Sequence, residues 1–393
     1  MRVDPAEARE ELAVAAATLE RSLAGDDLPA FYAELRGTHL PFLAAGIESA
    51  ADARELFRLC YEILHRFGGI SPAVALALEN HLYVSAALAT LPLADDPPLD
   101  ARRRALLAQM EAGRLLIANT NSRVHADKLA TVGTRARREG DGYRIDGSAT
   151  FLSLARESDL LLFVTRIEEE GPGIFITPLK GNPGLAIGDL LFPDAMRDSD
   201  TRQLTFHDLR LPAESLLVAG QDDRVAGLFT FQLIWHQALT AALFLGAAAG
   251  AIEEARRFLC AVRTKDDRPL SELDGMVAQV GRLAIRYRGA CCVVRQAGEA
   301  LSAVAAGGLD GPAVGDAFDL AAAAKYLGTQ CAEEVVAEAR RIVGARAMAG
   351  GSRLARLSQE VIFGPLAPEV GAFIERRYGK RALAAASFLD ERW

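Results

Sequence analysis

The spacing of apolar residues divides the chain into three stretches of different periodicity. Apolar residues recur at helical spacing up to about residue 118, alternate with polar residues in the middle, and return to helical spacing further on. The pattern therefore predicts an N-terminal helical domain (1–118), a middle β-domain (119–222) and a C-terminal helical domain (223–393).

Helix-start signals and breaks locate the N-terminal helices. Asp4 precedes Pro5, which combines a capping carboxylate with a proline at the first helical position. Pro97 and Pro98 interrupt the helical pattern before its last segment. Further helices are expected over Ala53–Phe67, Pro72–Thr90 and Ala101–Ile117.

Short alternating segments separated by turn residues predict a β-barrel in the middle of the chain. Glu139–Gly142 contains an Asp-Gly pair, which is a hairpin-turn signal. The strands expected around it are Thr131–Arg137, Tyr143–Ile145, Ala149–Ser153, Leu160–Thr165, Gly173–Pro178 and Gln203–Phe206. Short strands at regular spacing are typical of a barrel.

Long helices are predicted for the C-terminal part. They are expected over Ala238–Val262, Glu272–Ala305 and Gly315–Ile342, with a shorter pair at the end, as in a bundle of four or five helices. The longest apolar run, Ala238–Ile252, is too short to span a bilayer, so we expect a buried core helix there.

Composition and charge exclude several classes of partner. The 393 residues have a formal net charge of −8 and no cluster of Lys and Arg, which argues against nucleic acid. The charged N-terminus does not resemble a signal peptide, and no membrane segment is predicted. The histidines lack ligand spacing, so no metal site is predicted. The five cysteines show no paired spacing, and we expect buried thiols in a cytoplasmic protein.

Three segments are similar to signatures of one enzyme family. Ala195–Leu217 resembles the run that closes the middle β-domain of acyl-CoA dehydrogenases, Arg135–Ser153 resembles their Gly-Asp-Gly hairpin, and Ala321–Gly344 resembles one of their helix pairs. The chain is identified as a member of the acyl-CoA dehydrogenase superfamily. The resemblance implies the acyl-CoA dehydrogenase fold, with an N-terminal helical domain, a middle β-barrel and a C-terminal four-helix bundle.

The resemblance also implies a flavin between the barrel and the bundle, at a subunit interface of a homodimer or homotetramer. The cofactor would be FAD, with FMN as an alternative. The cofactor-binding positions implied by the alignment are Asn121, Ser122, Phe151, Ser153, Arg263 and Gly344. Phe151 and Ser153 fall beside the flavin ring, and Asn121 and Ser122 fall in the loop that faces the pyrophosphate.

Two of these segments depart from the family pattern. The loop facing the phosphates has Asp127 where the family has a small hydroxyl residue, and a carboxylate there would repel phosphate unless Lys128 compensates. Arg263 stands where the family has an arginine that reaches the neighbouring subunit's pyrophosphate, but without the usual Phe-Gly. Its alternative role is that of a cation at a helix C-terminus.

The catalytic position departs further. The family's usual base is a Glu that follows an Arg-Asp pair, whereas here Gln359 and Glu360 replace the pair and Pro368 stands at the Glu position. Glu369, one residue later, is one candidate base, and a helix-start carboxylate is its alternative interpretation. A subset of the family carries its Glu on the first long bundle helix, where His236 stands here.

The roles of the remaining polar residues stay open at this point. His236 can act as a base, orient an oxygen-derived group in a monooxygenase, or be an ordinary helix histidine. Glu360 is expected to pair with a nearby Arg. His81 lies on the helix that lines the substrate cavity in this fold, and we expect a satisfied core histidine there.

Three functions are therefore compatible with the chain. The first is flavin-dependent α,β-desaturation of an acyl thioester on CoA or a carrier protein, with Glu369 or His236 as the base. The second is a flavin-dependent monooxygenase or N-hydroxylase of the same fold. The third is a catalytically inactive subunit that partners a related dehydrogenase in a heteromer.

Overall fold

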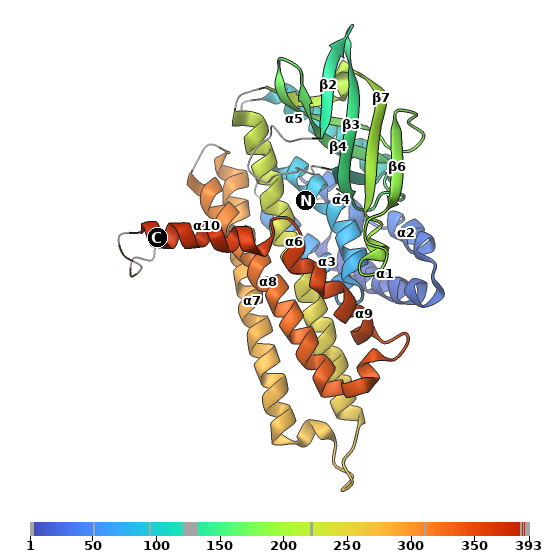
Figure 1. Cartoon of the computed structure of the whole chain (residues 1–393), viewed down its shortest axis with the longest axis vertical. Helices are drawn as coiled ribbons and strands as arrows, with labels where there is room; N and C mark the ends of the chain where they lie inside the picture. Colours follow the sequence, from blue (N-terminus) through green and yellow to red (C-terminus); the bar gives the residue numbers. More distant parts are fainter. Residues whose placement is uncertain are drawn as a thin grey trace.

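The computed structural model describes residues 4–49, 52–93, 96–120, 133–220, 223–309, 312–385, 387 and 389. Helices come first, strands follow, and long helices complete the chain; Figure 1 shows the strands at one end of the molecule and the long helices at the other. The α-helices are α1 (Pro5–Gly25), α2 (Leu28–Arg36), α3 (Ala53–Gly68), α4 (Pro72–Thr90), α5 (Pro97–Gly113), α6 (Asp223–Ala261), α7 (Asp274–Gly307), α8 (Pro312–Val343), α9 (Arg353–Glu360) and α10 (Gly371–Ala384). Short 3₁₀ segments include η1 (Leu40–Gly46), η7 (Gly344–Met348) and η8 (Val361–Leu366).

Capping residues start helices α1 and α4, and the Asp4 cap of α1 was predicted from the sequence. The Asp4 carboxylate accepts a hydrogen bond from the amide of Ala6 at 2.9 Å, with Pro5 at the first helical position. Ser71 does the same for α4, where its hydroxyl oxygen accepts from the Val74 amide at 3.3 Å. All of α4 is buried, which places its few polar side chains in the interior.

The β-region is one continuous sheet. Its strands are β1 (Ile117–Thr120), β2 (Thr134–Glu139), β3 (Gly142–Leu152), β4 (Leu160–Ile167), β5 (Gly171–Pro178), β6 (Leu185–Leu190), β7 (Arg202–Pro212) and β8 (Leu216–Ala219). They pair in the order β6-β7-β3-β2-β4-β5-β8, and β1 runs parallel to β4. The predicted hairpin joins β2 to β3, with Glu139 opposite Gly142.

A bulge in β3 determines how one important side chain points. The register between β3 and β7 shifts between Ala149 and Leu152, and Phe151 within this interval has a φ of 62°. A bulge re-aims the side chains beside it. Phe151 consequently leaves the sheet core and is half exposed, whereas Leu152 is fully buried.

Helix α6 is the central element of the C-terminal part. It has 39 residues and a length of about 58 Å at the helical rise. Its Gly246 lies against the end of α3, where an added Cβ would be 2.1 Å from the His65 carbonyl oxygen. The two backbones therefore touch directly.

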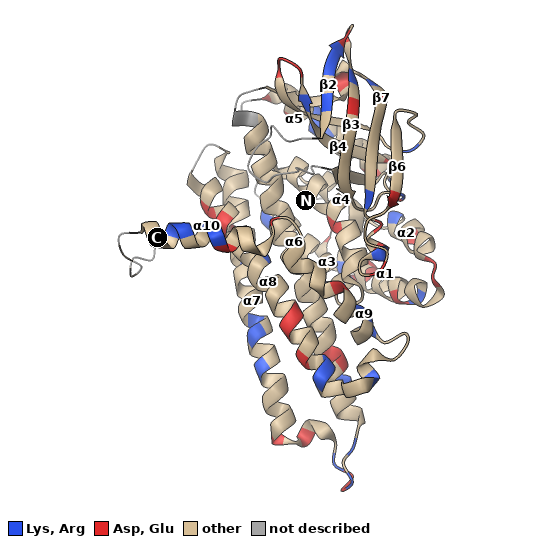
Figure 2. Ribbon diagram, viewed as in Figure 1, with Lys and Arg blue, Asp and Glu red and all other residues tan. Residues whose placement is uncertain are grey.

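The molecule has two hydrophobic cores. The larger one joins residues of the N-terminal helices to residues of α6, α7 and α8, and the smaller one lies inside the sheet. The N-terminal and C-terminal helices thus share one core although the sheet separates them in sequence. Figure 2 shows Lys and Arg interspersed with Asp and Glu at both ends of the molecule.

Several expected boundaries were wrong. The helix expected over Ala101–Ile117 is α5, which begins at Pro97 and ends at Gly113, because Arg114 adopts a left-handed conformation (φ 51°) and Ile117 joins the sheet. The helix expected from Ala238 begins at Asp223. Pro368 and Glu369 do not start a helix, since α10 begins at Gly371.

Two further predictions concern the burial of the cysteines and of the longest apolar helix. All five cysteines are free, but only Cys60, Cys291 and Cys331 are buried, so the expectation of burial was wrong for Cys260 and Cys292. The stretch Val225–Ala261 is long and apolar enough to cross a membrane by length and composition alone, and 78% of its most apolar window is buried inside the protein. This burial confirms the predicted core helix.

Candidate functional site

A buried carboxylate and a histidine form the centre of the site. Glu79 projects from α4 and is 1% exposed, and its Oε1 lies 2.8 Å from Nδ1 of His236 on α6. The other ring nitrogen, Nε2, lies 3.0 Å from the carbonyl oxygen of Pro368. A carbonyl only accepts, so Nε2 carries a hydrogen. The His236 ring is thus held at both nitrogens, by Glu79 of α4 and by the backbone of Pro368.

Tyrosine and asparagine continue this polar network toward the sheet. The Tyr83 ring, one turn after Glu79 on α4, lies 5.0 Å from the His236 ring between centroids. The Asn119 side-chain amide on β1 donates to the Tyr83 hydroxyl oxygen at 2.8 Å. The next residue, Thr120, donates to the carbonyl of Thr150 at 3.0 Å, directly before Phe151. The network therefore links the two long helical regions to the end of β3.

The network contains buried oxygens without a partner. Oε2 of Glu79 and Oδ1 of Asn119 accept no hydrogen bond among the described residues, and the same is true of Oε1 of Gln237. Among the described residues, the unpartnered donors in this region are Nε1 of Trp235 and Nε and Nη2 of Arg377. An unpaired buried polar atom costs about 1–3 kcal/mol. The free oxygens of Glu79 and Asn119 could each accept a hydrogen bond from a ligand.

The loop of residues 367–369, which contains the family's usual base position, is bound by side chains of two helices. Lys325 on α8, which is fully buried, donates to the carbonyls of Ala367 and Glu369, both at 2.7 Å. Burial lowers the pKa of Lys325 to about 8. The carbonyl of Pro368, between them, faces His236. The backbone of this loop is therefore bound from α6 and from α8.

The Glu369 carboxylate is engaged in an ion pair. Both of its oxygens lie 2.6 Å from Nη1 of Arg377, and Gln237 donates to Oε2 at 3.3 Å. Arg377 also pairs with Asp319 at 3.4 Å. Both oxygens of the Glu369 carboxylate are therefore occupied by donors of this chain.

Three phenylalanine rings form a row between the end of β3 and η8. The Phe151 ring stacks on Phe192 with centroids 6.0 Å apart, and Phe192 meets Phe363 of η8 edge-on at 5.0 Å. Phe151 is 51% exposed, so one face of this set is open. Ser153 is buried, and its hydroxyl is 2.9 Å from that of Thr201.

Two of the other predicted cofactor positions, Arg263 and Gly344, have their described contacts elsewhere. Arg263 donates to the carbonyl of Asp267 at 2.6 Å in the turn after α6, and Gly344 starts η7 with a φ of 71°. Asn121 and Ser122 lie outside the described residues. The flavin-binding roles of these residues remain predictions.

His81 and Glu360, two polar residues singled out in the sequence, make contacts that hold parts of the fold together. His81 is fully buried, accepts from the Ile117 amide through Nδ1 and faces the Pro41 carbonyl through Nε2 at 2.7 Å, as expected for a core histidine. Glu360 was expected to pair with an arginine. Instead its Oε2 accepts from the Ser71 hydroxyl and the Ala73 amide, both at 2.9 Å, at the start of α4.

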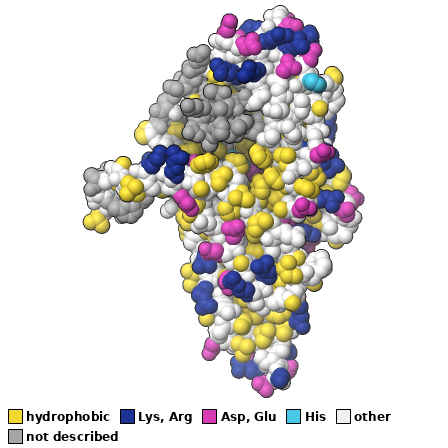
Figure 3. All heavy atoms as spheres, viewed as in Figure 1, with side chains coloured by type: hydrophobic (Ala, Val, Ile, Leu, Met, Phe, Trp, Pro, Cys, Tyr) yellow, Lys and Arg dark blue, Asp and Glu magenta, His cyan; other side chains and the backbone are white. Residues whose placement is uncertain are grey.

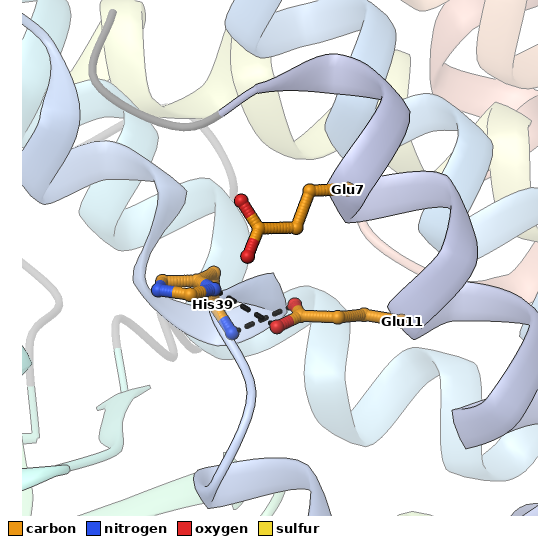
Figure 4. A group of neighbouring side chains, drawn as sticks. All are labelled: Glu7, Glu11 and His39. Carbon is orange, nitrogen blue, oxygen red and sulfur yellow. Dashed lines mark hydrogen bonds and ion pairs between the residues drawn. The ribbon is translucent and has the colours of Figure 1, made fainter.

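A separate group at the N-terminus brings together Glu7, Glu11 and His39 (Figure 4). Glu11 accepts from both the ring and the backbone amide of His39, each at 2.8 Å. These bonds join α1 to the start of η1. Glu7 is exposed, whereas Glu11 and His39 are partly buried.

Four residues of the site were missed from the sequence. Glu79 and Tyr83 are spaced four apart on α4, so they share one face of a helix whose other residues are mostly apolar. That spacing was the available signal. Lys325 lies in the Ala321–Gly344 segment that resembles the family's helix pair, and Asn119 gave no signal. The roles of both depend on contacts with distant segments.

Comparisons with known proteins give a consistent result. Residues 229–364 match the family model described as "Acyl-CoA dehydrogenase, C-terminal domain". Isobutylamine N-hydroxylase of Streptomyces viridifaciens is 25% identical over 60% of this chain and 62% of its own length. The mitochondrial long-chain specific acyl-CoA dehydrogenase of Rattus norvegicus is 30% identical over 39% of this chain and 36% of its own length.

Whole-chain similarity is seen in structure. The FMN-bound form of TdsC from Paenibacillus sp. A11-2, a dibenzothiophene monooxygenase, matches 96% of this chain and 97% of its own with a TM-score of 0.80 and 18% identity. That likeness shows the fold. The sequence match spans less than two thirds of the length of the two curated relatives.

Proposed function

This chain belongs to the acyl-CoA dehydrogenase superfamily, and from that premise we propose that it is a flavin-dependent oxidoreductase of the monooxygenase type, which oxidises a small organic substrate with reduced flavin and oxygen. The observation on which this choice rests is the state of Glu369. Its carboxylate is paired with Arg377 through both oxygens. Desaturation requires a free base beside the substrate.

His236 supports the same choice. Both of its ring nitrogens are already in hydrogen bonds, one to Glu79 and one to the Pro368 carbonyl. The ring therefore has no free lone pair with which to remove a carbon-bound proton. Its position fits a residue that fixes the wall of a cavity and its charge distribution.

The aromatic side of the site fits a flat ring cofactor. Phe151 presents half of its surface at the open end of a row of three phenylalanines, and the unpartnered Asn119 oxygen lies nearby through Thr120 and Thr150. Phe151 would pack against the isoalloxazine of FAD or FMN and exclude water from it. A bound reduced flavin supplies the electrons for oxygen activation. The family assignment supports FAD, and the TdsC structure is consistent with FMN.

Tyr83 is the donor that this chain can offer to a developing negative charge. Its hydroxyl oxygen accepts from Asn119, which leaves the hydroxyl hydrogen free to point into the site. Burial raises the pKa of Tyr83, so the hydroxyl stays protonated at neutral pH. A fixed neutral donor stabilises an oxyanion without adding charge.

Desaturation of an acyl thioester is the second candidate. Residues 229–364 match the C-terminal domain of acyl-CoA dehydrogenases. The long-chain specific acyl-CoA dehydrogenase of Rattus norvegicus is one of the relatives. We further propose a cytoplasmic homo-oligomer, a dimer or tetramer. A heteromer with a related active subunit corresponds to the third function.

The first experiment is a flavin titration of the purified protein. We expect FAD or FMN to bind and to raise the melting temperature. At a flavin concentration of 100 times Kd, the folded state should be stabilised by about 2.7 kcal/mol. Phe151→Ala should weaken flavin binding, while Ile187→Ala, an exposed apolar residue of the same sheet, should not. A protein that binds neither oxidised flavin would contradict the desaturation candidate and leave the monooxygenase, which uses reduced flavin, and the inactive subunit for the second experiment to separate.

The second experiment separates the two reactions. With a flavin reductase and NADH, the monooxygenase should consume oxygen, and Glu369→Gln should change that rate less than about threefold, which corresponds to under about 0.7 kcal/mol. Octanoyl-CoA should leave the oxidised flavin spectrum unbleached. Bleaching that disappears in Glu369→Gln would instead establish desaturation with Glu369 as the base.

A further inference from the structure

The free oxygens of the Glu79 network define what the site can bind. Oε1 of Glu79 is occupied by His236 and by the Thr240 hydroxyl at 3.3 Å, but Oε2 has no partner although the side chain is 1% exposed. A buried carboxylate oxygen without a donor is costly, and a charged acceptor forms stronger hydrogen bonds than a neutral one. A ligand that donates to Oε2 would remove this cost.

A second free acceptor belongs to the same network. Asn119 uses its amide hydrogens on Tyr83 and leaves Oδ1 unpartnered. Because Tyr83 also packs against His236, both free oxygens are attached to one connected set of side chains. A hydroxyl group donates one hydrogen bond, whereas an amine donates two or three. A carbonyl or carboxylate donates none and would place acceptor against acceptor.

We propose that Glu79 is the residue that determines substrate specificity, and that its Oε2 receives the N–H group of a primary or secondary amine. The inference rests on the proposed function for the chemistry that follows binding, but the binding itself is independent of it. The amine nitrogen would lie at Oε2 of Glu79, where α4 packs against α6. Glu79 would thereby select amines over thioesters.

Three hexyl compounds of similar size test the selectivity. In Trp393→Phe protein, Trp235 is the only tryptophan and lies next to His236, so its fluorescence reports on the site. Titration with hexylamine should change this fluorescence, with hexan-1-ol binding more weakly and hexanoate most weakly. Equal affinity for hexylamine and hexanoate, or no response to hexylamine, would overturn the proposal.

Glu79→Gln tests the residue. The glutamine oxygen can still accept from His236, so its NH₂ group would replace Oε2 and offer a donor where the wild type offers an acceptor. Hexylamine affinity should fall by about tenfold or more, the equivalent of a charge-assisted hydrogen bond. Hexanoate affinity should rise. Unchanged preference in Glu79→Gln would overturn the assignment even if the wild type prefers hexylamine.

Glu360→Gln is the matched control. It makes the same substitution at another buried glutamate, 5% exposed, at the start of α4 and away from the unpartnered oxygens. It should leave the preference for hexylamine intact. Failure of the proposed function is separately visible, because flavin binding and oxygen consumption are measured without any amine. Flavin turnover without amine selectivity would reject Glu79 alone, and amine selectivity without flavin binding would reject the proposed function alone.

Discussion

Single buried polar groups in this protein have very different consequences, depending on the partners that the fold supplies. Glu360 and Glu79 are both buried, and both contact α4. Glu360 caps the helix start through Ser71 and Ala73, while Glu79 pairs with a histidine and keeps one oxygen free. The first arrangement stabilises a helix end, and the second provides a site.

The titration of Glu360 gives a prediction at this scale. Burial raises the pKa of Glu360 from 4.5 to about 8, with Asp198 raising it further and Arg356 lowering it. The folded state then holds a proton that the unfolded chain has lost between pH 4.5 and 8. The stability contributed by the protonated residue is therefore complete below pH 4.5 and is lost as the pH rises toward 8.

Glu360→Gln should remove this dependence, since glutamine resembles the neutral acid. The free energy of unfolding of Glu360→Gln minus that of wild type should increase by on the order of a few kcal/mol as the pH rises from 5 to 8. Urea denaturation at several pH values measures it. Glu214→Gln, at an exposed position, serves as control. A pH-independent difference between Glu360→Gln and wild type would show that Glu360 is ionised in the folded protein.

At the scale of elements, helix contacts decide where the polar groups meet. Helix α6 carries His236 and Gln237 to the Glu79 face of α4 and to the 367–369 loop. Its position is set by direct backbone contact with the end of α3 at Gly246 and Gly250. A displacement of α6 at this crossing would move His236 relative to Glu79.

Gly246→Ala tests the crossing. The new Cβ would lie 2.1 Å from the His65 carbonyl oxygen, and since backbone cannot rotate away, α3 and α6 must separate. We expect destabilisation of about 1–3 kcal/mol or more in thermal or urea unfolding. Gly281→Ala in α7, where the Cβ meets nothing within 4 Å, should instead stabilise by roughly 0.5–1 kcal/mol. Equal effects of the two substitutions would contradict the close approach.

At the scale of the whole molecule, the exposed apolar surface indicates association. Figure 3 shows hydrophobic side chains gathered across the middle of one face, below the strands. Large apolar residues that are at least 47% exposed occur on η8 and α10, namely Ile362, Leu366, Phe373 and Leu383. In Figure 1, α10 projects sideways from the bundle. Exposed apolar residues in one region commonly mark an interaction surface.

Phe373→Glu should therefore weaken self-association. We expect the wild type to sediment as a dimer or tetramer and the variant to shift toward smaller species, because a buried unpaired carboxylate is costly at an interface. Analytical ultracentrifugation measures the shift. Ile285→Glu, on the exposed face of α7, distinguishes a general effect of added charge from loss of one interface. A monomeric wild type would reject the proposed oligomer.

The sequence alone determined the order of helices and strands, because periodicity and capping are local properties. Asp4 and Pro5, Ser71 before α4, and the Gly140–Asp141 turn between β2 and β3 act over a few residues. The motifs of the hairpin and of residues 195–217 also predicted the resemblance to the superfamily, and residues 229–364 match its C-terminal domain model. Boundaries failed where the competing signal was non-local, as at Ile117, which pairs with Leu160 in the sheet.

Only the tertiary structure decided the composition of the site. It placed Glu79 against His236, 157 residues away in sequence, and bound Glu369 to Arg377. No periodicity contains these pairings, because they depend on how α4, α6 and the 367–369 loop pack together. Hydrogen bonding and burial, which determine whether a carboxylate is free or engaged, arise only from that packing.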